Sequence, residues 1–207
     1  NTSDGCECQD DFCGCESAPS PGCEGWTTDE VEVWYQLSPN FPGSTLLAAA
    51  HGVQINTWVN GANGEAPDQD WERCFSKSVD GKGSFDQEAK NFHARCDGLG
   101  PTLTMAKLSN GKLVGGYAGV SWASSGGDTL SVSNLYKRSS TNFLFSLTNE
   151  FRRDLIEGRE GNAQYHEESS YGPTFGGGYG DHDLYIQSDM NGGVCDPGHT
   201  YTCRVGR

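Results

Sequence analysis

Two stretches in the first half of the chain place apolar residues at helical intervals. The first follows Ser44 and repeats every three or four residues, at Leu47, His51, Ile55 and Trp58. This spacing gives one apolar face of an α-helix, and Ser44 is a suitable N-cap residue. We therefore expect a helix from Ser44 to about Asn60, with His51 beside the core rather than acting as a ligand.

The second stretch begins at a capping box, Ser84-Phe85-Asp86-Gln87. Its apolar stripe consists of Phe85, Ala89, Phe92 and Cys96, and His93 lies next to it. We expect a second helix that ends near Cys96. Because Cys74 precedes this helix and Cys96 ends it, these two cysteines are expected to form a disulfide.

The second half of the chain alternates short β-prone runs with turn residues. Thr102–Leu108 and residues 112–117 flank Asn110-Gly111, which is the strongest short-range signal for a β-hairpin. Further strand-like runs cover residues 142–147, 183–188 and 201–205, and residues 31–35 form a short strand or the start of a helix. Helices followed by hairpin-linked strands predict an α+β fold with antiparallel sheets.

The first 25 residues have almost no side chains that could form a core. Acidic residues, cysteines and turn formers dominate there, so cross-links must hold the segment. Its cysteines are Cys6, Cys8, Cys13, Cys15 and Cys23. Disulfides are the favoured interpretation; the alternative is a set of thiolate metal ligands, but the segment has no histidine and no zinc-like spacing. The expected organisation is a Cys-rich segment, residues 1–25, followed by one domain, residues 26–207.

Charge is concentrated in the first third of the chain. The 207 residues include 28 Asp or Glu and 14 Lys or Arg, a formal net charge of −14. Thirteen acidic residues precede the first basic residue, Arg73, and the remainder of the chain is almost balanced. Without a basic stripe, neither nucleic acid nor an anionic membrane is an expected partner. No apolar run approaches the roughly 20 residues of a membrane span, so no membrane insertion is expected.

Cysteine usage indicates an oxidising compartment. Cys74, Cys96, Cys195 and Cys203 bring the total to nine, and all nine are expected to form disulfides. The chain begins with Asn1, as a mature product does once its signal peptide has been removed, so we expect a secreted, extracellular protein. Nine cysteines form at most four internal pairs, and the ninth is available for a disulfide-linked homodimer. A capped or unpaired thiol is the alternative.

Several sequence blocks resemble the signature motifs of TLDc domains. They are FHARCDGLGPTLT at 92–104, GGY at 115–117, WAS at 122–124, FLFSL at 143–147, GPTFGGG at 172–178 and DLYI at 183–186. They occur in the order typical of that family and extend over about residues 45–205. The resemblance implies a sandwich of two antiparallel β-sheets with flanking helices. Most TLDc proteins are intracellular and are linked with oxidation resistance or regulation of a proton pump.

Two features set this chain apart from most TLDc domains. One is the acidic Cys-rich segment, and the other is a three-residue insertion, Tyr179-Gly180-Asp181, after the glycine run. A Cys-stapled extracellular version of this fold resembles the galactose-binding lectins of sea anemones. That resemblance rests on overall layout and implies a calcium-dependent lectin that binds galactose-terminated glycans.

Candidate chemistry favours binding over catalysis. The run around Ser121 lacks the closing glycine of a nucleophile elbow, and His166-Glu167-Glu168 is not a zinc-protease motif, so no enzyme is expected. The densest carboxylates outside the first 25 residues are Glu167, Glu168, Asp181 and Asp183, which are candidate Ca²⁺ ligands. The candidate sugar-binding residues beside them are His166, Tyr171, Tyr179 and His182.

Alternatives remain open at this point. The four acidic residues can instead be solvated surface charges, and Asp183 can be structural. A rival metal loop would use Asp189, Asn191 and Asp196. The rival function is a secreted protein-interaction or structural module that binds no sugar, and an antioxidant role ranks third.

Overall fold

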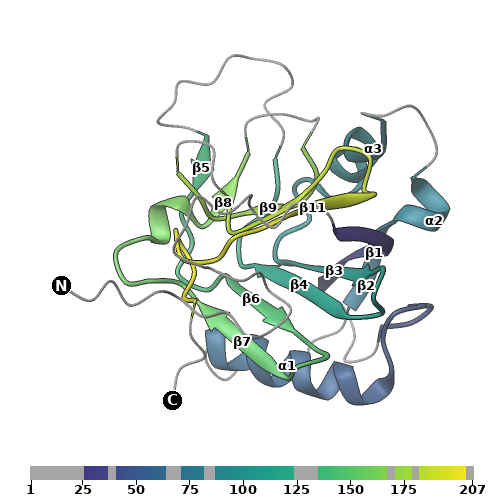
Figure 1. Ribbon diagram of the computed structural model, residues 1–207, viewed down its shortest axis with the longest axis horizontal. Coiled ribbons are helices and arrows are strands. Elements are labelled where there is room, and N and C mark those ends of the chain that lie inside the picture. Colours follow the sequence, from purple (N-terminus) through teal and green to yellow (C-terminus); the bar gives the residue numbers. More distant parts are fainter. Residues whose placement is uncertain are drawn as a thin grey trace.

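The protein consists of two antiparallel β-sheets stacked on each other, with helices at the flanks (Figure 1). The computed structural model describes residues 26–36, 41–63, 71–81, 87–123, 135–166, 171–178 and 182–203. The α+β sandwich predicted from the sequence is confirmed. The Cys-rich segment, residues 84–86 of the capping box and residues 204 and 205 of the last predicted strand lie outside the described residues.

The larger sheet has six strands in the described part of the chain, in the order β2-β1-β3-β4-β6-β7. They are β1 (Trp26–Gln36), β2 (Trp71–Ser76), β3 (Thr102–Leu108), β4 (Leu113–Ala118), β6 (Phe143–Ser146) and β7 (Phe151–Asp154). β3 and β4 form the hairpin predicted from Asn110-Gly111, which is confirmed.

The smaller sheet has five short strands among the described residues. They are β5 (Tyr136–Lys137), β8 (Gln164–Tyr165), β9 (Thr174–Phe175), β10 (Leu184–Ile186) and β11 (Gly192–Cys195). β1 connects the two sheets, because its first residues pair with β11 and the rest pair with β3. From residue 201, only Tyr201 pairs, as an isolated bridge to Leu155.

The helices occupy separate places around the sandwich. They are α1 (Ala49–Asn63), α2 (Lys77–Asp80), α3 (Gln87–Cys96) and the 3-10 turn η2 (Glu160–Asn162). α1 covers the outer face of the six-stranded sheet (Figure 1). Its Ile55 and Val59 pack there against Leu103, Phe143 and Phe145. The six-stranded sheet is therefore buried on both faces.

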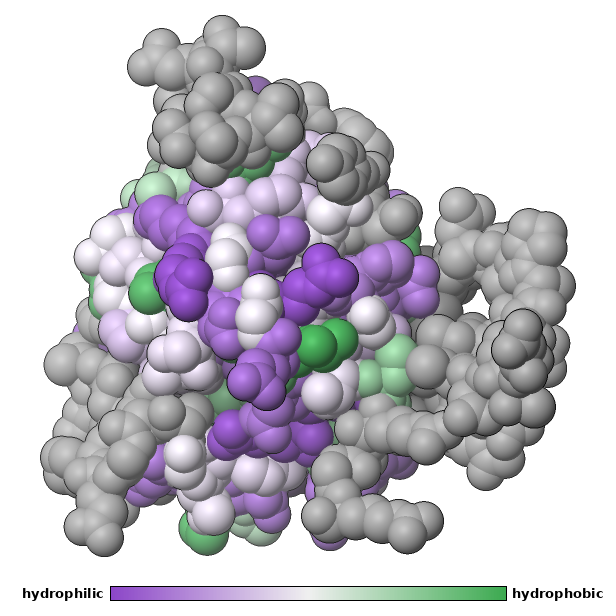
Figure 2. All heavy atoms as spheres, turned by 90° about the vertical axis from the view of Figure 1, so that its left-hand side faces the viewer, coloured by the Kyte–Doolittle hydropathy of each residue, from purple (hydrophilic) through white to green (hydrophobic). Residues whose placement is uncertain are grey.

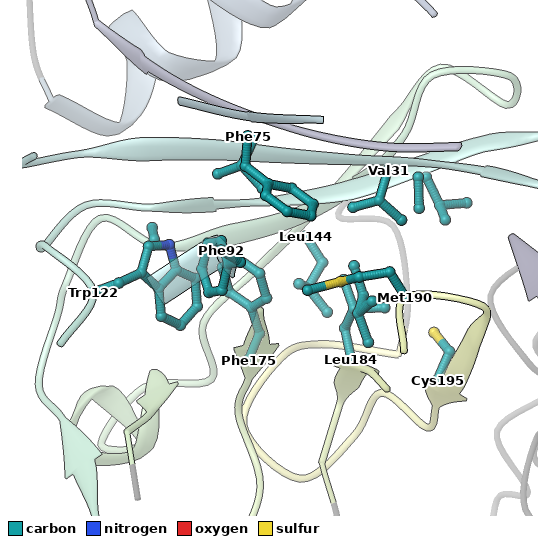
Figure 3. Close-up of a cluster of buried hydrophobic side chains, with 14 of the residues drawn as sticks. Val31, Phe75, Phe92, Trp122, Leu144, Phe175, Leu184, Met190 and Cys195 are labelled. Carbon is teal, nitrogen blue, oxygen red and sulfur yellow. The ribbon is translucent and has the colours of Figure 1, made fainter. Parts of the chain in front are cut away.

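The main core lies between the two sheets (Figure 3). Val31, Phe75 and Leu144 contribute to it from the larger sheet, and Phe175, Leu184 and Ile186 from the smaller one. α3 adds Phe92, whose ring lies 5.8 Å from that of Trp122. Gly116 allows the sheets to approach, since a Cβ atom there would lie 2.7 Å from the Phe175 ring. The GGY and GPTF blocks thus meet across the core.

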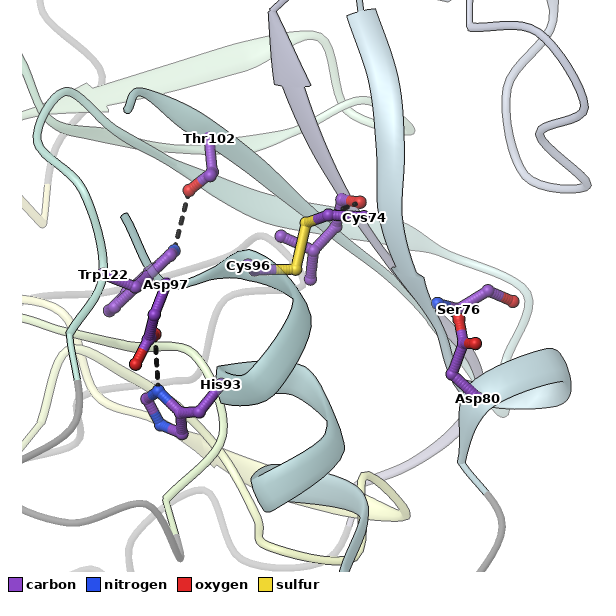
Figure 4. The surroundings of a disulfide bond; sticks show 9 residues. Cys74, Ser76, Asp80, His93, Cys96, Asp97, Thr102 and Trp122 are labelled. Atoms are coloured by element: carbon purple, nitrogen blue, oxygen red, sulfur yellow. Dashed lines mark hydrogen bonds and ion pairs between the residues drawn. A yellow bond between two sulfur atoms is a disulfide. The ribbon is translucent and has the colours of Figure 1, made fainter. Parts of the chain in front are cut away.

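The predicted second helix and its disulfide are confirmed. α3 buries Ala89, Phe92 and Cys96, and Cys96 is bonded to Cys74 on β2 (Figure 4). Between the described residues Cys195 and Cys203 there is no disulfide. Cys195 is buried in the core, and the thiol of Cys203 donates to the carbonyl of Pro197 at 2.6 Å.

The first predicted helix begins later than expected. Ser44 accepts the backbone N–H groups of Leu46 and Leu47, as an N-cap does, but α1 starts at Ala49. The buried carboxylate of Glu32 explains the difference. It accepts hydrogen bonds from the Ser44 hydroxyl at 2.5 Å and the Thr45 backbone N–H at 3.0 Å. These bonds tie the segment to β1 instead of extending the helix.

The described surface is mainly polar. The face drawn in Figure 2 shows hydrophobic residues only in small, separate patches. Among the described residues, the exposed large hydrophobic side chains are Val53, Val79 and Leu99. No helix in this part of the chain is long and apolar enough to cross a membrane.

Candidate functional site

Four tyrosines and one histidine form a continuous group of rings on the smaller sheet. We call this group the tyrosine cluster; its members are Tyr136, Tyr165, Tyr171, His182 and Tyr185. Tyr165 is central: its ring centroid lies 5.2 Å from Tyr136, 5.2 Å from Tyr171 and 4.8 Å from His182. Tyr171 in turn lies 5.1 Å from Tyr185. These separations are typical of packed aromatic rings.

Strand alternation places the cluster on the face opposite the core. Leu184 and Ile186 of β10 enter the main core, so Tyr185 between them points to the other face. The buried amide of Gln164 donates to the Val120 carbonyl, and strand alternation places its neighbour Tyr165 on the opposite face of β8. Tyr136 is paired with Tyr165 across β5 and β8. Tyr136, Tyr171 and Tyr185 are partly exposed, whereas Tyr165 and His182 are buried.

Chemically, the cluster can bind a ligand that has an apolar face and a polar rim. Aromatic rings offer flat apolar surface, and tyrosine hydroxyls add hydrogen-bonding groups at its edge. Binding sites for small ligands commonly combine such surfaces with a few oriented polar groups. The ring of His182 is held in the cluster by its Nδ1 atom, which lies 3.1 Å from the Gly176 carbonyl oxygen.

Next to His182, the Asp183 side chain has a structural position. Its carboxylate is buried and accepts hydrogen bonds from four consecutive backbone N–H groups, those of Gly198, His199, Thr200 and Tyr201, at 3.0 to 3.2 Å. Burial raises the pKa of this carboxyl, and the backbone hydrogen bonds oppose that rise. Because four backbone N–H groups already bind this buried carboxylate, we infer a structural role for Asp183 in place of the predicted role as a calcium ligand.

His166, a predicted sugar contact, lies on the inner side of the cluster. Its ring is buried against Trp122 at 5.7 Å, and Nδ1 lies 2.9 Å from the Ala123 carbonyl. Burial is the largest of the effects that lower its pKa to about 4, and the positive charges of Lys137 and His93 add to it. The ring is therefore neutral near pH 7. Its burial on this inner side does not suit the predicted role as a sugar contact.

Comparison with known proteins identifies the family. Residues 42–205 match the TLDc domain, and this match covers most of the 207-residue chain. The chain belongs to the TLDc domain family. No curated protein matches it. The family motifs form the TLDc core: GGY lies in β4, FLFS forms β6, and LYI forms β10.

Several predicted site residues of this TLDc domain lie outside the described residues. They are the carboxylates Glu167, Glu168 and Asp181, and Tyr179. Within the described ranges, no group of three or more His, Cys, Asp or Glu side chains could hold a metal ion. The calcium prediction therefore stays a prediction.

The rival metal loop is not assembled in the TLDc domain. Asp189 lies in the turn between β10 and β11, where its carboxylate accepts the backbone N–H of Asn191 at 3.0 Å. Asp196 follows β11 at the opposite end of that hairpin and faces His199 at 3.5 Å. The strand of four residues between them separates the two carboxylates by roughly 10 Å or more.

Of the predicted sugar contacts, the structure brings together Tyr171 and His182, whose ring centroids lie 6.3 Å apart. Sequence reasoning missed Tyr136, Tyr165 and Tyr185. The signal for Tyr185 was its position between the apolar residues Leu184 and Ile186. No comparable signal marked Tyr136 or Tyr165, because a strand of two residues shows no alternation.

Proposed function

We propose that this TLDc-domain protein is a secreted, calcium-dependent lectin that binds terminal galactose at the tyrosine cluster. One observation carries the proposal. Tyr171 directly follows the segment that contains Glu167 and Glu168, and His182 directly follows Asp181. The rings of Tyr171 and His182 lie 6.3 Å apart, so both carboxylate-bearing segments end beside the same aromatic surface.

The cluster suits the two kinds of surface that a galactose ring presents. One face of this sugar is lined by C–H groups, which pack against an aromatic ring such as Tyr185 or Tyr171. Its hydroxyl groups require hydrogen-bonding partners, and the tyrosine hydroxyls and Tyr179 are candidates. Tyr171 and Tyr185 are partly exposed, as a stacking surface must be.

Calcium would supply the polar half of the recognition. Ca²⁺ takes six to eight oxygen ligands, typically carboxylates, carbonyls and water. Glu167, Glu168 and Asp181 are the proposed carboxylate ligands, and two vicinal sugar hydroxyls would replace bound water. The described carboxylate that is nearest to them in sequence, Asp183, is engaged by backbone amides and is not part of this proposed set.

We also propose that the protein is a homodimer linked through its Cys-rich segment. Nine cysteines leave one after four pairs, and two sites in one molecule give avidity for clustered glycans. A mass measurement under non-reducing conditions tests this part separately. A mass of one chain without reductant would contradict the covalent dimer and leave the sugar site untouched.

A glycan array with and without EDTA tests the lectin. We expect retention of terminal galactosides in calcium and its loss in chelator. If no galactoside is retained in calcium, the lectin proposal fails and a protein-interaction module takes its place. Binding that is unchanged in chelator would contradict the calcium site alone.

Matched variants locate the site. Asp181→Ala should abolish galactoside binding, whereas Asp189→Ala, in the turn at the other end of the β10–β11 hairpin, should leave it unchanged. Tyr185→Ala removes an aromatic ring from the binding surface and should weaken binding by about tenfold or more. A tenfold loss corresponds to only about 1.4 kcal/mol of binding free energy. Tyr185→Phe keeps the ring and should retain most of the affinity. If Tyr185→Ala binds as the wild type does, the cluster is not the binding surface.

A further inference from the structure

We propose that His93 is a positioning residue for the tyrosine cluster: as a doubly protonated ring, it holds the backbone carbonyl of Tyr171 and so fixes one ring of the ligand surface. This inference rests on the proposed function for its ligand. Its structural part concerns described residues only and can be tested without any ligand.

His93 bridges the last turn of α3 and the loop that carries Tyr171. Its Nδ1 atom lies 2.8 Å from Oδ1 of Asp97, a contact drawn in Figure 4. Its Nε2 atom lies 2.9 Å from the backbone oxygen of Tyr171. The side chain is buried, so water cannot readily substitute for either partner. The two ring nitrogens thus make one contact to Asp97, which directly follows α3, and one to the cluster.

The chemistry of these partners determines the protonation state. A carbonyl oxygen only accepts hydrogen bonds, and an ionised carboxylate also only accepts. Both nitrogens must therefore donate, and a histidine ring donates from both only as the imidazolium. A neutral ring would direct a lone pair at one of the two oxygens. Hydrogen bonds that involve an ionised group are about twice as strong as neutral ones.

The surrounding charges are consistent with a positive ring. Asp97 is the negative partner, and it also interacts with the ammonium of Lys137 on β5, which donates to the Ser121 carbonyl at 2.9 Å. His166 also interacts with His93, and it is neutral near pH 7. Phe92 contributes an apolar ring at 4.7 Å. The network of His93, Asp97 and Lys137 therefore connects α3 to β5 beneath the cluster.

The consequence for binding follows from the place of Tyr171. Its ring packs on Tyr165 and Tyr185, so a shift of its backbone alters the surface that faces the ligand. Loss of the second proton from His93 removes one of its two hydrogen bonds. Galactoside affinity should then fall as pH rises, in the direction opposite to the fall that carboxylate protonation causes at low pH.

Two variants separate the roles of the contact and of the charge. His93→Gln cannot span both partners and should weaken binding of methyl β-galactoside by about tenfold or more. In Asp97→Asn the amide N–H can donate to Nδ1 of a neutral ring, while Nε2–H still donates to Tyr171. Asp97→Asn should therefore keep the affinity and lose its decline with rising pH. The proposed calcium ligands are the same in all three proteins.

The experiment combines calorimetry with NMR on the full-length protein in calcium, over about pH 5 to 8, where histidines ordinarily change charge. Ring ¹⁵N shifts of His93 report its protonation, and the carbonyl ¹³C shift of Tyr171 reports the contact. We expect a doubly protonated ring. We also expect the ring ¹⁵N shifts of His93 and the carbonyl ¹³C shift of Tyr171 to change together as the pH is varied. Thermal melting of each variant confirms that it is folded. If His93→Gln does not fold, the pH profile of galactoside affinity in Asp97→Asn still tests the proposal.

Three results would overturn the inference. They are a neutral His93 ring with the Tyr171 carbonyl shift unchanged across the range, wild-type affinity in folded His93→Gln, and a wild-type pH profile in Asp97→Asn. If no protein binds galactoside but the Tyr171 carbonyl shift follows the titration of His93, the lectin proposal fails while the positioning of Tyr171 by His93 is supported.

Discussion

The backbone N–H of Tyr201 donates a hydrogen bond of 3.0 Å to the carboxylate of Asp183, and this contact joins the residue that precedes β10 to the segment that follows β11. Three preceding N–H groups share the same carboxylate. Asp183→Ala would leave buried donors without acceptors, at about 1–3 kcal/mol each. We expect the free energy of unfolding to fall by about 3 kcal/mol or more, measured by urea denaturation.

Asp196→Ala is the matched control for Asp183→Ala. Asp196 is partly exposed and forms an ion pair with a partly exposed histidine, so its loss should cost about 0–1 kcal/mol. Equal stability of the Asp183 and Asp196 variants would contradict the structural role of Asp183. It would also restore Asp183 as a candidate ligand.

Gly116 is required where β4 faces the smaller sheet. A Cβ atom there would lie 2.7 to 3.0 Å from three atoms of the Phe175 ring. Gly116→Ala should therefore destabilise the protein by about 1–3 kcal/mol, the usual cost of overpacking a core. Gly161→Ala is the control, because a Cβ atom there would have no neighbour within 4 Å. A thermal melt of Gly116→Ala that matches that of Gly161→Ala would show that the sheets can separate locally.

Much of the fold could be predicted because the deciding signals are local. Asn110-Gly111 specified the β3–β4 hairpin, and the stripe of Ala89, Phe92 and Cys96 specified α3. The start of α1 could not be predicted in this way. It depends on Glu32, a buried acid on a distant strand that binds the Ser44 and Thr45 groups. Nothing near Ser44 in sequence reveals that partner.

The candidate site was predictable only in part, for a similar reason. Tyr171 and His182 flank the carboxylate-bearing segments, and proximity in sequence was enough to select them. Asp183 belongs to the same acidic group, but its role is set by backbone amides fifteen or more residues away. Tyr136 and Tyr165 join the cluster through the pairing of β5 with β8, which is a tertiary feature.

The Cys74–Cys96 disulfide should be a major source of stability. It closes a loop with a sequence separation of 22, and a loop of that size is worth about 3 kcal/mol in chain entropy. The double variant Cys74→Ala/Cys96→Ala should lose about that amount in urea denaturation. The double variant removes this disulfide alone, whereas a reductant would act on every disulfide of the protein. An unchanged denaturation midpoint would mean that α3 is held on β2 by packing alone.

The buried ring of His166 should make the protein less stable in mild acid. Its pKa is lowered to about 4 in the fold, chiefly by burial, against an ordinary value of 6.5. Between these values the unfolded chain takes up a proton that the folded protein does not, so stability falls as pH decreases from about 6.5 to about 4. This difference amounts to on the order of 3 kcal/mol. His166→Phe keeps a ring against Trp122 without a titrating group, and both proteins have the same carboxylates. Urea denaturation from pH 7.5 to 4 should therefore show a steeper loss of stability in the wild type than in the variant, and parallel curves would contradict a neutral, buried His166.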